Sequence, residues 1–166
     1  MKFGDFFTAM DRACVDYVLV GGLAVSLQGA VRGTLDVDVV LAMTDENLAR
    51  FIEAAGAMGL SPSLPVPIQA LADPVQIDRW FNEKNMIAFS LRESAPAGLV
   101  VDVLVRPCVP FEELRSAAVV KTLGVARIPV ASVPHLIALK SGTGRSIDAL
   151  DVEQLRRLHG PGASTS

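Results

Sequence analysis

The sequence predicts a mixed α/β fold, in which a small sheet of about five strands is flanked by helices. Short β-branched runs of strand length alternate along the chain with segments whose apolar residues recur at helical spacing. Glycine, proline and helix-capping residues separate these segments. The 166 residues, of which 51% are apolar, are enough for one domain with a sizeable core. We expect that domain to span residues 1–159, ending in helices, before a flexible tail at 160–166.

Each element follows from one of these patterns. Apolar periodicity, with Thr44 and Ser132 as helix caps, predicts helices over Phe3–Cys14, Leu23–Ala30, Asp45–Met58, Pro110–Ala118, Pro134–Lys140 and Ser146–Leu158. Apolar or alternating runs predict strands at Tyr17–Val20, Thr34–Leu41, Val75–Phe81, Met86–Leu91 and Leu99–Val105, with one or two more within Val119–Val130. The strands at Val75–Phe81 and Met86–Leu91 are expected to form a hairpin-like pair. The proline-rich stretch Ser61–Pro74 is expected to be a loop.

Composition excludes several classes of protein. The net charge is −3, and no stripe of Lys or Arg marks a surface that grips long stretches of nucleic acid. The apolar runs are too short to span a membrane, and the first residues do not resemble a signal peptide. The two cysteines, Cys14 and Cys108, have no metal-ligand or disulfide pattern. We therefore expect a cytoplasmic protein without a membrane partner.

Three aspartates occupy unusual positions in the predicted strands. Asp36 and Asp38 are two residues apart, so both leave the same face of the sheet, between the apolar neighbours of a largely buried strand. Asp102 interrupts a strand that is otherwise wholly apolar. Carboxylates crowded in such surroundings repel one another and lose hydration, so a positive partner must offset the cost. A hard cation such as Mg²⁺, which prefers oxygen ligands, fits this requirement.

Other interpretations hold for each acid taken singly. Asp102 alone could be a strand-end or edge residue. Asp36 and Asp38 could lie on a solvated edge or pair with Arg32. The coincidence of three acids on two buried strands favours the metal site.

A glycine pair follows the first predicted strand. Gly21 and Gly22 lie between Tyr17–Val20 and the next helix, and glycines at such a turn let the backbone approach a phosphate closely. Many strand–glycine–helix turns need only the permissive backbone. Here, however, a single short helix separates the turn from Asp36, which would bring phosphates and metal together.

These segments resemble the nucleotidyltransferase superfamily, whose pattern is an apolar strand, Gly-Gly or Gly-Ser, a short helix and then Asp-x-Asp or Asp-x-Glu. The pattern is carried here by Tyr17–Ala24 followed by Arg32–Asp38. The Arg-x-Thr before the acid pair looks most like small AbiEii-like bacterial nucleotidyltransferases, several of which are toxins of toxin–antitoxin pairs. A looser similarity to that group covers Lys140, Gly144-Arg145, Asp148 and Asp151.

The resemblance implies the nucleotidyltransferase fold and an activity. The enzyme would move a nucleoside monophosphate from an NTP to an acceptor hydroxyl and release pyrophosphate. Asp36, Asp38 and Asp102 would bind Mg²⁺ or Mn²⁺, and Asp102 would also take the acceptor proton. The nucleotide would be bound by Gly21, Gly22, Arg32 and Lys140. Many members have Gly-Ser, whose hydroxyl contacts phosphate, and Gly22 lacks that group.

Partners and alternatives remain open at this stage. The acceptor could be an RNA end, a protein side chain or a small molecule, and the same fold could instead serve as an inactive module that binds a cognate antitoxin or toxin. Arg32 could brace the acids rather than contact phosphate. Lys140 could extend to solvent, and Arg145 could form helix-surface pairs with Asp148 and Asp151.

Overall fold

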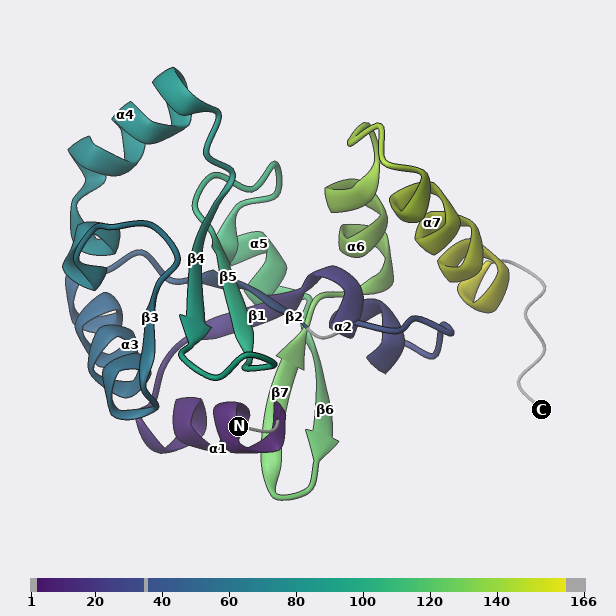
Figure 1. Cartoon of the computed structure of the whole chain (residues 1–166). Helices are drawn as coiled ribbons and strands as arrows, with labels where there is room; N and C mark the ends of the chain where they lie inside the picture. Colours follow the sequence, from purple (N-terminus) through teal and green to yellow (C-terminus); the bar gives the residue numbers. More distant parts are fainter. Residues whose placement is uncertain (1–2, 35, 161–166) are drawn as a thin grey trace.

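The computed structural model describes residues 3–34 and 36–160 (Figure 1). Leu35, within a predicted strand, and all but the first residue of the predicted flexible tail lie outside the described residues. No helix in the described part of the chain combines the length and the apolar character needed to cross a membrane.

Within the described residues, one mixed sheet has the strand order β3-β4-β5-β2-β1-β7-β6. Two neighbouring pairs are parallel, β2 with β5 and β1 with β7, and the others are antiparallel. The described sheet has seven strands where about five were expected, and this difference in detail comes mainly from short strands at its edges. Their bounds are β1 Tyr17–Val20, β2 Asp36–Leu41, β3 Leu60–Pro62, β4 Ala88–Glu93, β5 Val100–Leu104, β6 Val119–Leu123 and β7 Ala126–Val130.

Helices lie around this sheet. In Figure 1, α3 and α4 lie at one end of the molecule, α6 and α7 at the other, and the β6–β7 hairpin projects between them. The helices are α1 Phe3–Arg12, α2 Gly21–Leu27, α3 Asp45–Ala57, the 3₁₀ helix η1 Ile68–Ala72, α4 Pro74–Lys84, α5 Phe111–Ser116, α6 Val133–Lys140 and α7 Ser146–His159. Thr44 caps α3 as predicted, since its side chain accepts from the Asn47 N–H (3.3 Å).

The sheet has one apolar face and one partly open face in its centre. Along β2 and β5, residues Val37, Val39, Val101 and Val103 are buried in the core. The residues between them point the other way, because successive side chains of a strand alternate. The predicted aspartates are on that second face and are partly or fully accessible.

One predicted strand is wrong. Residues 74–84, expected to contribute the strand Val75–Phe81, form helix α4, so the predicted hairpin-like pair does not exist. Asp73 caps this helix by accepting from the Gln76 N–H (3.0 Å), and Pro74 occupies its first turn. Asn85 ends it in the left-handed conformation. The capping residue and the stop signal outweigh the β-branched residues that suggested a strand.

Candidate active site

The three predicted acids lie on the two neighbouring strands β2 and β5 at the centre of the sheet, on its partly open face. Asp38 on β2 is directly paired in register with Asp102 on the parallel strand β5, and Asp36 is paired with Val100. On the other side of β2, Asp38 is paired with Val20, the last residue of β1. The sheet thus brings Asp38 and Asp102, which are far apart in sequence, into one row, and Asp36 lies two residues away on the same face of β2.

The environment of Asp38 opposes its ionisation. Burial, the charge of Asp102 and the charge of Asp36 raise the pKa of Asp38 to about 6, although the Gly22 backbone N–H and the charge of Lys140 act in the opposite direction. The carboxylates are therefore close enough to repel one another. A site of this kind gains stability from a bound cation.

Asp102 has a partner that the sequence reasoning missed. The Ser90 hydroxyl on β4 donates to Asp102 Oδ1 (2.5 Å), and the two residues are directly paired across the strands. Phe89 and Leu91 are buried on the core side of β4, so Ser90 must face the open side. The contact could have been predicted only by pairing strand β4 with strand β5 in the correct register.

The glycine turn packs directly against Asp38. Helix α2 begins at Gly21, whose φ is +67°, a conformation that favours glycine. A Cβ atom on Gly21 would lie 1.9 Å from Asp38 Oδ2, so only glycine fits. Gly22 is buried, and its N–H donates to Asp38. The turn and the acids therefore form a single unit.

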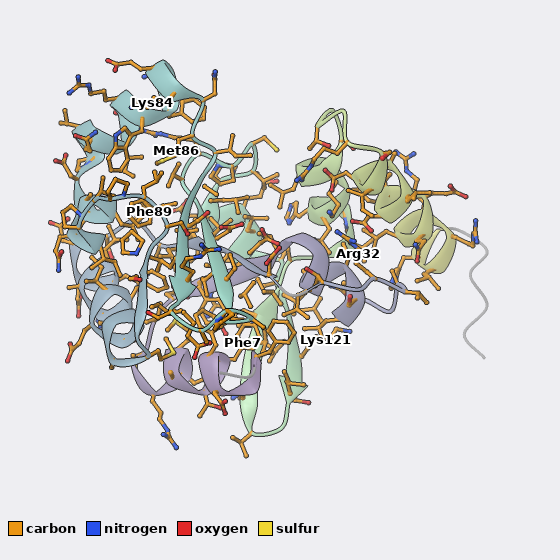
Figure 2. All side chains as sticks on the ribbon, viewed as in Figure 1. Phe7, Arg32, Lys84, Met86, Phe89 and Lys121 are labelled. Atoms are coloured by element: carbon orange, nitrogen blue, oxygen red, sulfur yellow. The ribbon has the colours of Figure 1, made fainter. Side chains whose placement is uncertain are left out.

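Arg32 lies beside this turn. Its Nε is 3.5 Å from the position that a Cβ atom on Gly22 would take, and the Ser26 hydroxyl holds the local backbone by donating to the Arg32 carbonyl (2.7 Å). Its ion pair is with Asp151 (Nε to Oδ1, 3.5 Å). Among the described ion pairs, the brace from Arg32 to Asp36 or Asp38 does not occur. Arg32 lies on the side of the molecule that carries α6 and α7 (Figure 2).

Lys140 belongs to a buried charge cluster. Its Nζ lies 2.7 Å from Asp148 Oδ1 and 2.8 Å from Asp151 Oδ2, and all three side chains are almost fully buried. Burial raises the pKa of Asp148, but hydrogen bonds from Lys140, Thr143 and Arg145 outweigh it and hold that pKa below its usual value. The alternative of a solvent-extended Lys140 is therefore wrong. The pair of Arg145 with Asp148 does form (Nε to Oδ2, 2.6 Å), with Asp148 buried and Arg145 exposed, whereas the described ion pairs of Asp151 are with Lys140 and Arg32. The positive charge of Lys140 still acts on Asp38.

The donor set fits a hard divalent cation. Asp36, Asp38 and Asp102 offer only carboxylate oxygens, and their mutual repulsion raises the pKa of Asp38. In residues 3–34 and 36–160, however, no three His, Cys, Asp or Glu side chains already converge in the arrangement of a metal site. The three carboxylates would have to turn toward one another to share an ion.

Comparisons with known proteins were made by sequence and by structure. No family model matches the chain, and no curated protein matches its sequence. Solved structures do match: a lincosamide antibiotic adenylyltransferase, LnuA, with lincomycin bound, has a TM-score of 0.58 and 15% identity, covering 92% of each chain. This chain has the nucleotidyltransferase fold.

Two further nucleotidyltransferase structures are similar. An antigenic nucleotidyltransferase-like protein from Paracoccidioides brasiliensis has a TM-score of 0.54 and 19% identity, over 96% of this chain and 76% of that one. ANT(2")-Ia in complex with adenylyl-2"-tobramycin has a TM-score of 0.51 and 11% identity, over 91% of this chain and 83% of that one. The nucleotidyltransferase fold predicted from the glycine turn and the acid pair is thus confirmed.

Proposed function

We propose that this chain is a metal-dependent nucleotidyltransferase, which moves a nucleoside monophosphate from an NTP to an acceptor hydroxyl and releases pyrophosphate. The observation that carries the proposal is the row of Asp38 and Asp102 on one open sheet face, in contact with the Gly21-Gly22 turn. Such a row supplies carboxylates that would hold a divalent cation, and that cation would offset the phosphate charge. The nucleotidyltransferase fold supports the same reaction class.

The transfer is a substitution at phosphorus. The acceptor oxygen forms a bond to the α-phosphorus while the bond between that phosphorus and the oxygen bridging to the β-phosphate breaks, and pyrophosphate leaves. Asp102 takes the proton from the acceptor hydroxyl. Ser90 orients Asp102 through its hydrogen bond, because a carboxylate oxygen that accepts from a neighbouring hydroxyl is held in one direction.

Asp36, Asp38 and Asp102 would together hold Mg²⁺ or Mn²⁺. When bound, the metal supplies positive charge that aligns the α-phosphate and offsets its developing negative charge. Repulsion from Asp102 and Asp36, which raises the pKa of Asp38, supports this role, because a bound ion would relieve it.

Gly21, Gly22, Arg32 and Lys140 would form the nucleotide side of the site. Gly21 lets the backbone pass against Asp38, and Arg32 lies next to Gly22 with a partly exposed guanidinium. Arg32 is the residue we expect to contact the phosphates most directly. Lys140 adds positive charge, and a direct contact with phosphate would require its ammonium to leave Asp148 or Asp151.

The proposed reaction is compatible with more than one acceptor and subfamily. A hydroxyl of an RNA end, a protein or a small molecule satisfies the chemistry. Lincomycin and tobramycin, which are named with two of the structural neighbours, are the first acceptors to test. The resemblance to AbiEii-like enzymes and a cognate antitoxin or toxin partner stay predictions.

The test is transfer of label from each of the four α-labelled NTPs, with Mg²⁺, into a cell extract supplemented with lincomycin or tobramycin. Purified wild-type protein is expected to label a product. Asp38→Asn, which keeps the shape of the side chain, is expected to abolish labelling. Asp45→Asn, on an exposed first turn of α3, serves as the matched control.

The outcomes separate the two functions considered. Labelling that needs Asp38 but not Asp45 supports the transferase. If folded wild-type protein binds the Mg²⁺–NTP complex and transfers no label, the transferase is contradicted, and a non-catalytic module that binds a partner protein becomes the better account.

A further inference from the structure

We propose that a pocket beside Asp36 is the acceptor subsite, and that it takes a compact, neutral or cationic molecule carrying hydroxyl groups. This inference rests on the proposed transferase function. The pocket has a volume of about 630 Å³ and lies between the first residue of α1, the start of β2 and the turn that joins β4 to β5. Pockets of this size typically hold small organic molecules rather than polymers.

The strand register puts the pocket on the opposite side of the acids from the glycine turn. Asp36 on β2, Val100 on β5 and Arg92 on β4 form one row across the sheet, and all three line the pocket. The next row on the same face of the sheet, two residues along the strands, contains Asp38 and Asp102. Gly21 approaches Asp38 from the β1 side, whereas the pocket opens on the side of β5 and β4.

This order is the one that group transfer requires. The donor phosphates at the glycine turn and an acceptor in the pocket would meet over Asp38 and Asp102. Two residues along a strand span about 7 Å. A molecule seated on the Asp36 row would therefore reach the row of Asp38 and Asp102, just beyond the pocket lining, with a hydroxyl that extends along the strands.

The walls of the pocket are mainly apolar. Phe3, Ala95, Pro96, Ala97 and Leu99 supply hydrocarbon surface around the open side. The Gly98 N–H donates to the Ala95 carbonyl (2.9 Å), which closes the turn. An acceptor with an apolar body and hydroxyl groups at one end would match this lining, since the polar groups are gathered at the strand ends.

The charges in the lining decide the class of acceptor. Arg92 is the one cation of the lining among the described residues, and it shares its row of the sheet with the Asp36 carboxylate. The Glu93 carboxylate is already engaged, since it accepts from the Leu99 N–H (3.0 Å). A polynucleotide backbone needs several cations in a row. A neutral or cationic small molecule does not.

The test combines fractionated extract with a substitution that fills the pocket. Wild-type protein, Mg²⁺ and α-labelled ATP are incubated with the small-molecule, RNA and protein fractions, with lincomycin and tobramycin as added probes. Ala97→Trp adds bulk to the pocket and leaves every acid in place, and Ala57→Trp, at the exposed end of α3, is the matched control. Binding of Mg²⁺–ATP and the melting temperature are measured for each variant.

The expected result is label in the small-molecule fraction or the probes. Ala97→Trp should raise the acceptor KM by at least about tenfold and leave Mg²⁺–ATP binding unchanged, while Ala57→Trp behaves as wild type. Ala95→Trp replaces Ala97→Trp if the latter does not fold.

Three results would overturn the inference. Label only in RNA or protein contradicts the acceptor class and leaves the transferase standing. A pocket-filled variant as active as wild type contradicts the subsite alone. Absence of label in every fraction contradicts the transferase itself, and the subsite with it.

Discussion

Gly21 and Asp38 are packed so closely that no side chain fits between them. A Cβ atom on Gly21 would lie 1.9 Å from Asp38 Oδ2, and the backbone of Gly21 has a φ of +67°. The contact ties the turn after β1 to the central acid of β2. The position of Asp38 therefore requires glycine at residue 21, whether or not the turn also binds a ligand.

Gly21→Ala tests this contact. The left-handed conformation alone costs an alanine about 1–2 kcal/mol, and displacement of Asp38 adds about 1–3 kcal/mol of overpacking. Gly124→Ala is the matched control, because Gly124 has a φ of +63° and open space around it. Urea denaturation should show a clearly larger loss for Gly21→Ala. Equal losses in the two variants would mean that Asp38 yields freely.

The pKa of Asp38 predicts a pH dependence of stability in metal-free protein. Because the folded-state pKa of about 6 is above the unfolded value, the folded protein binds the proton first as pH falls. The ionised carboxylate therefore lowers stability above pH 6, and the penalty is relieved between pH 6 and about pH 4.

Asp38→Asn removes that penalty. The free energy of unfolding at pH 8 in EDTA should rise by about 2 kcal/mol, with little gain at pH 4. Asp36→Asn, which removes one of the weaker repulsions on Asp38, should produce a smaller gain. A variant Asp38→Asn less stable than wild type at pH 8 would show that the carboxylates do not repel one another in solution.

Ser90→Ala tests the hydrogen bond to Asp102. Loss of a hydrogen bond to a charged group is worth about 1.5 kcal/mol or more, so kcat for nucleotidyl transfer should fall by about tenfold. The Kd for Mg²⁺–ATP should change little, because Ser90 acts through Asp102. Ser61→Ala, at the exposed position of β3, is the control. An unchanged kcat in Ser90→Ala would remove Ser90 from the mechanism.

Lys140→Met tests the buried charge cluster. Without the ammonium, Asp148 and Asp151 face each other in a buried site, and removal of one partner of a buried ion pair costs about 3–5 kcal/mol. Lys84→Met, at the exposed end of α4, should change stability by less than about 0.5 kcal/mol. Thermal denaturation of both variants measures this difference in stability. Similar melting temperatures for the two variants would contradict a stabilising role for the ion pairs of Lys140.

Local sequence patterns were sufficient to predict that the candidate acids share a face of the sheet. Asp36 and Asp38 two residues apart, and Asp102 in an apolar strand, reveal acids that share a sheet face without any knowledge of strand order. The Gly21-Gly22 turn is also a local feature. The parallel pairing of β2 with β5, which brings Asp38 beside Asp102, agrees with that expectation.

Contacts that depend on tertiary packing were not predictable in this way. Ser90 contacts Asp102 only because β4 lies next to β5, and the sequence does not specify that order. Burial of Asp148 and Asp151 requires α7 to pack on Lys140 of α6, whereas their spacing along one helix equally fits a solvated surface. At α4, β-branched and aromatic residues suggested a strand, and the Asp73 cap with Pro74 decided for the helix.

The most direct test of the account is to follow the two ends of the nucleotide separately. Wild-type protein is incubated with acceptor and Mg²⁺, once with α-labelled ATP and once with γ-labelled ATP, and the products are separated. Nucleotidyl transfer predicts that the α label enters the acceptor while the γ label is recovered as pyrophosphate. Recovery of the γ label in the acceptor, with the α label left in ADP, would contradict it and indicate a phosphotransferase instead.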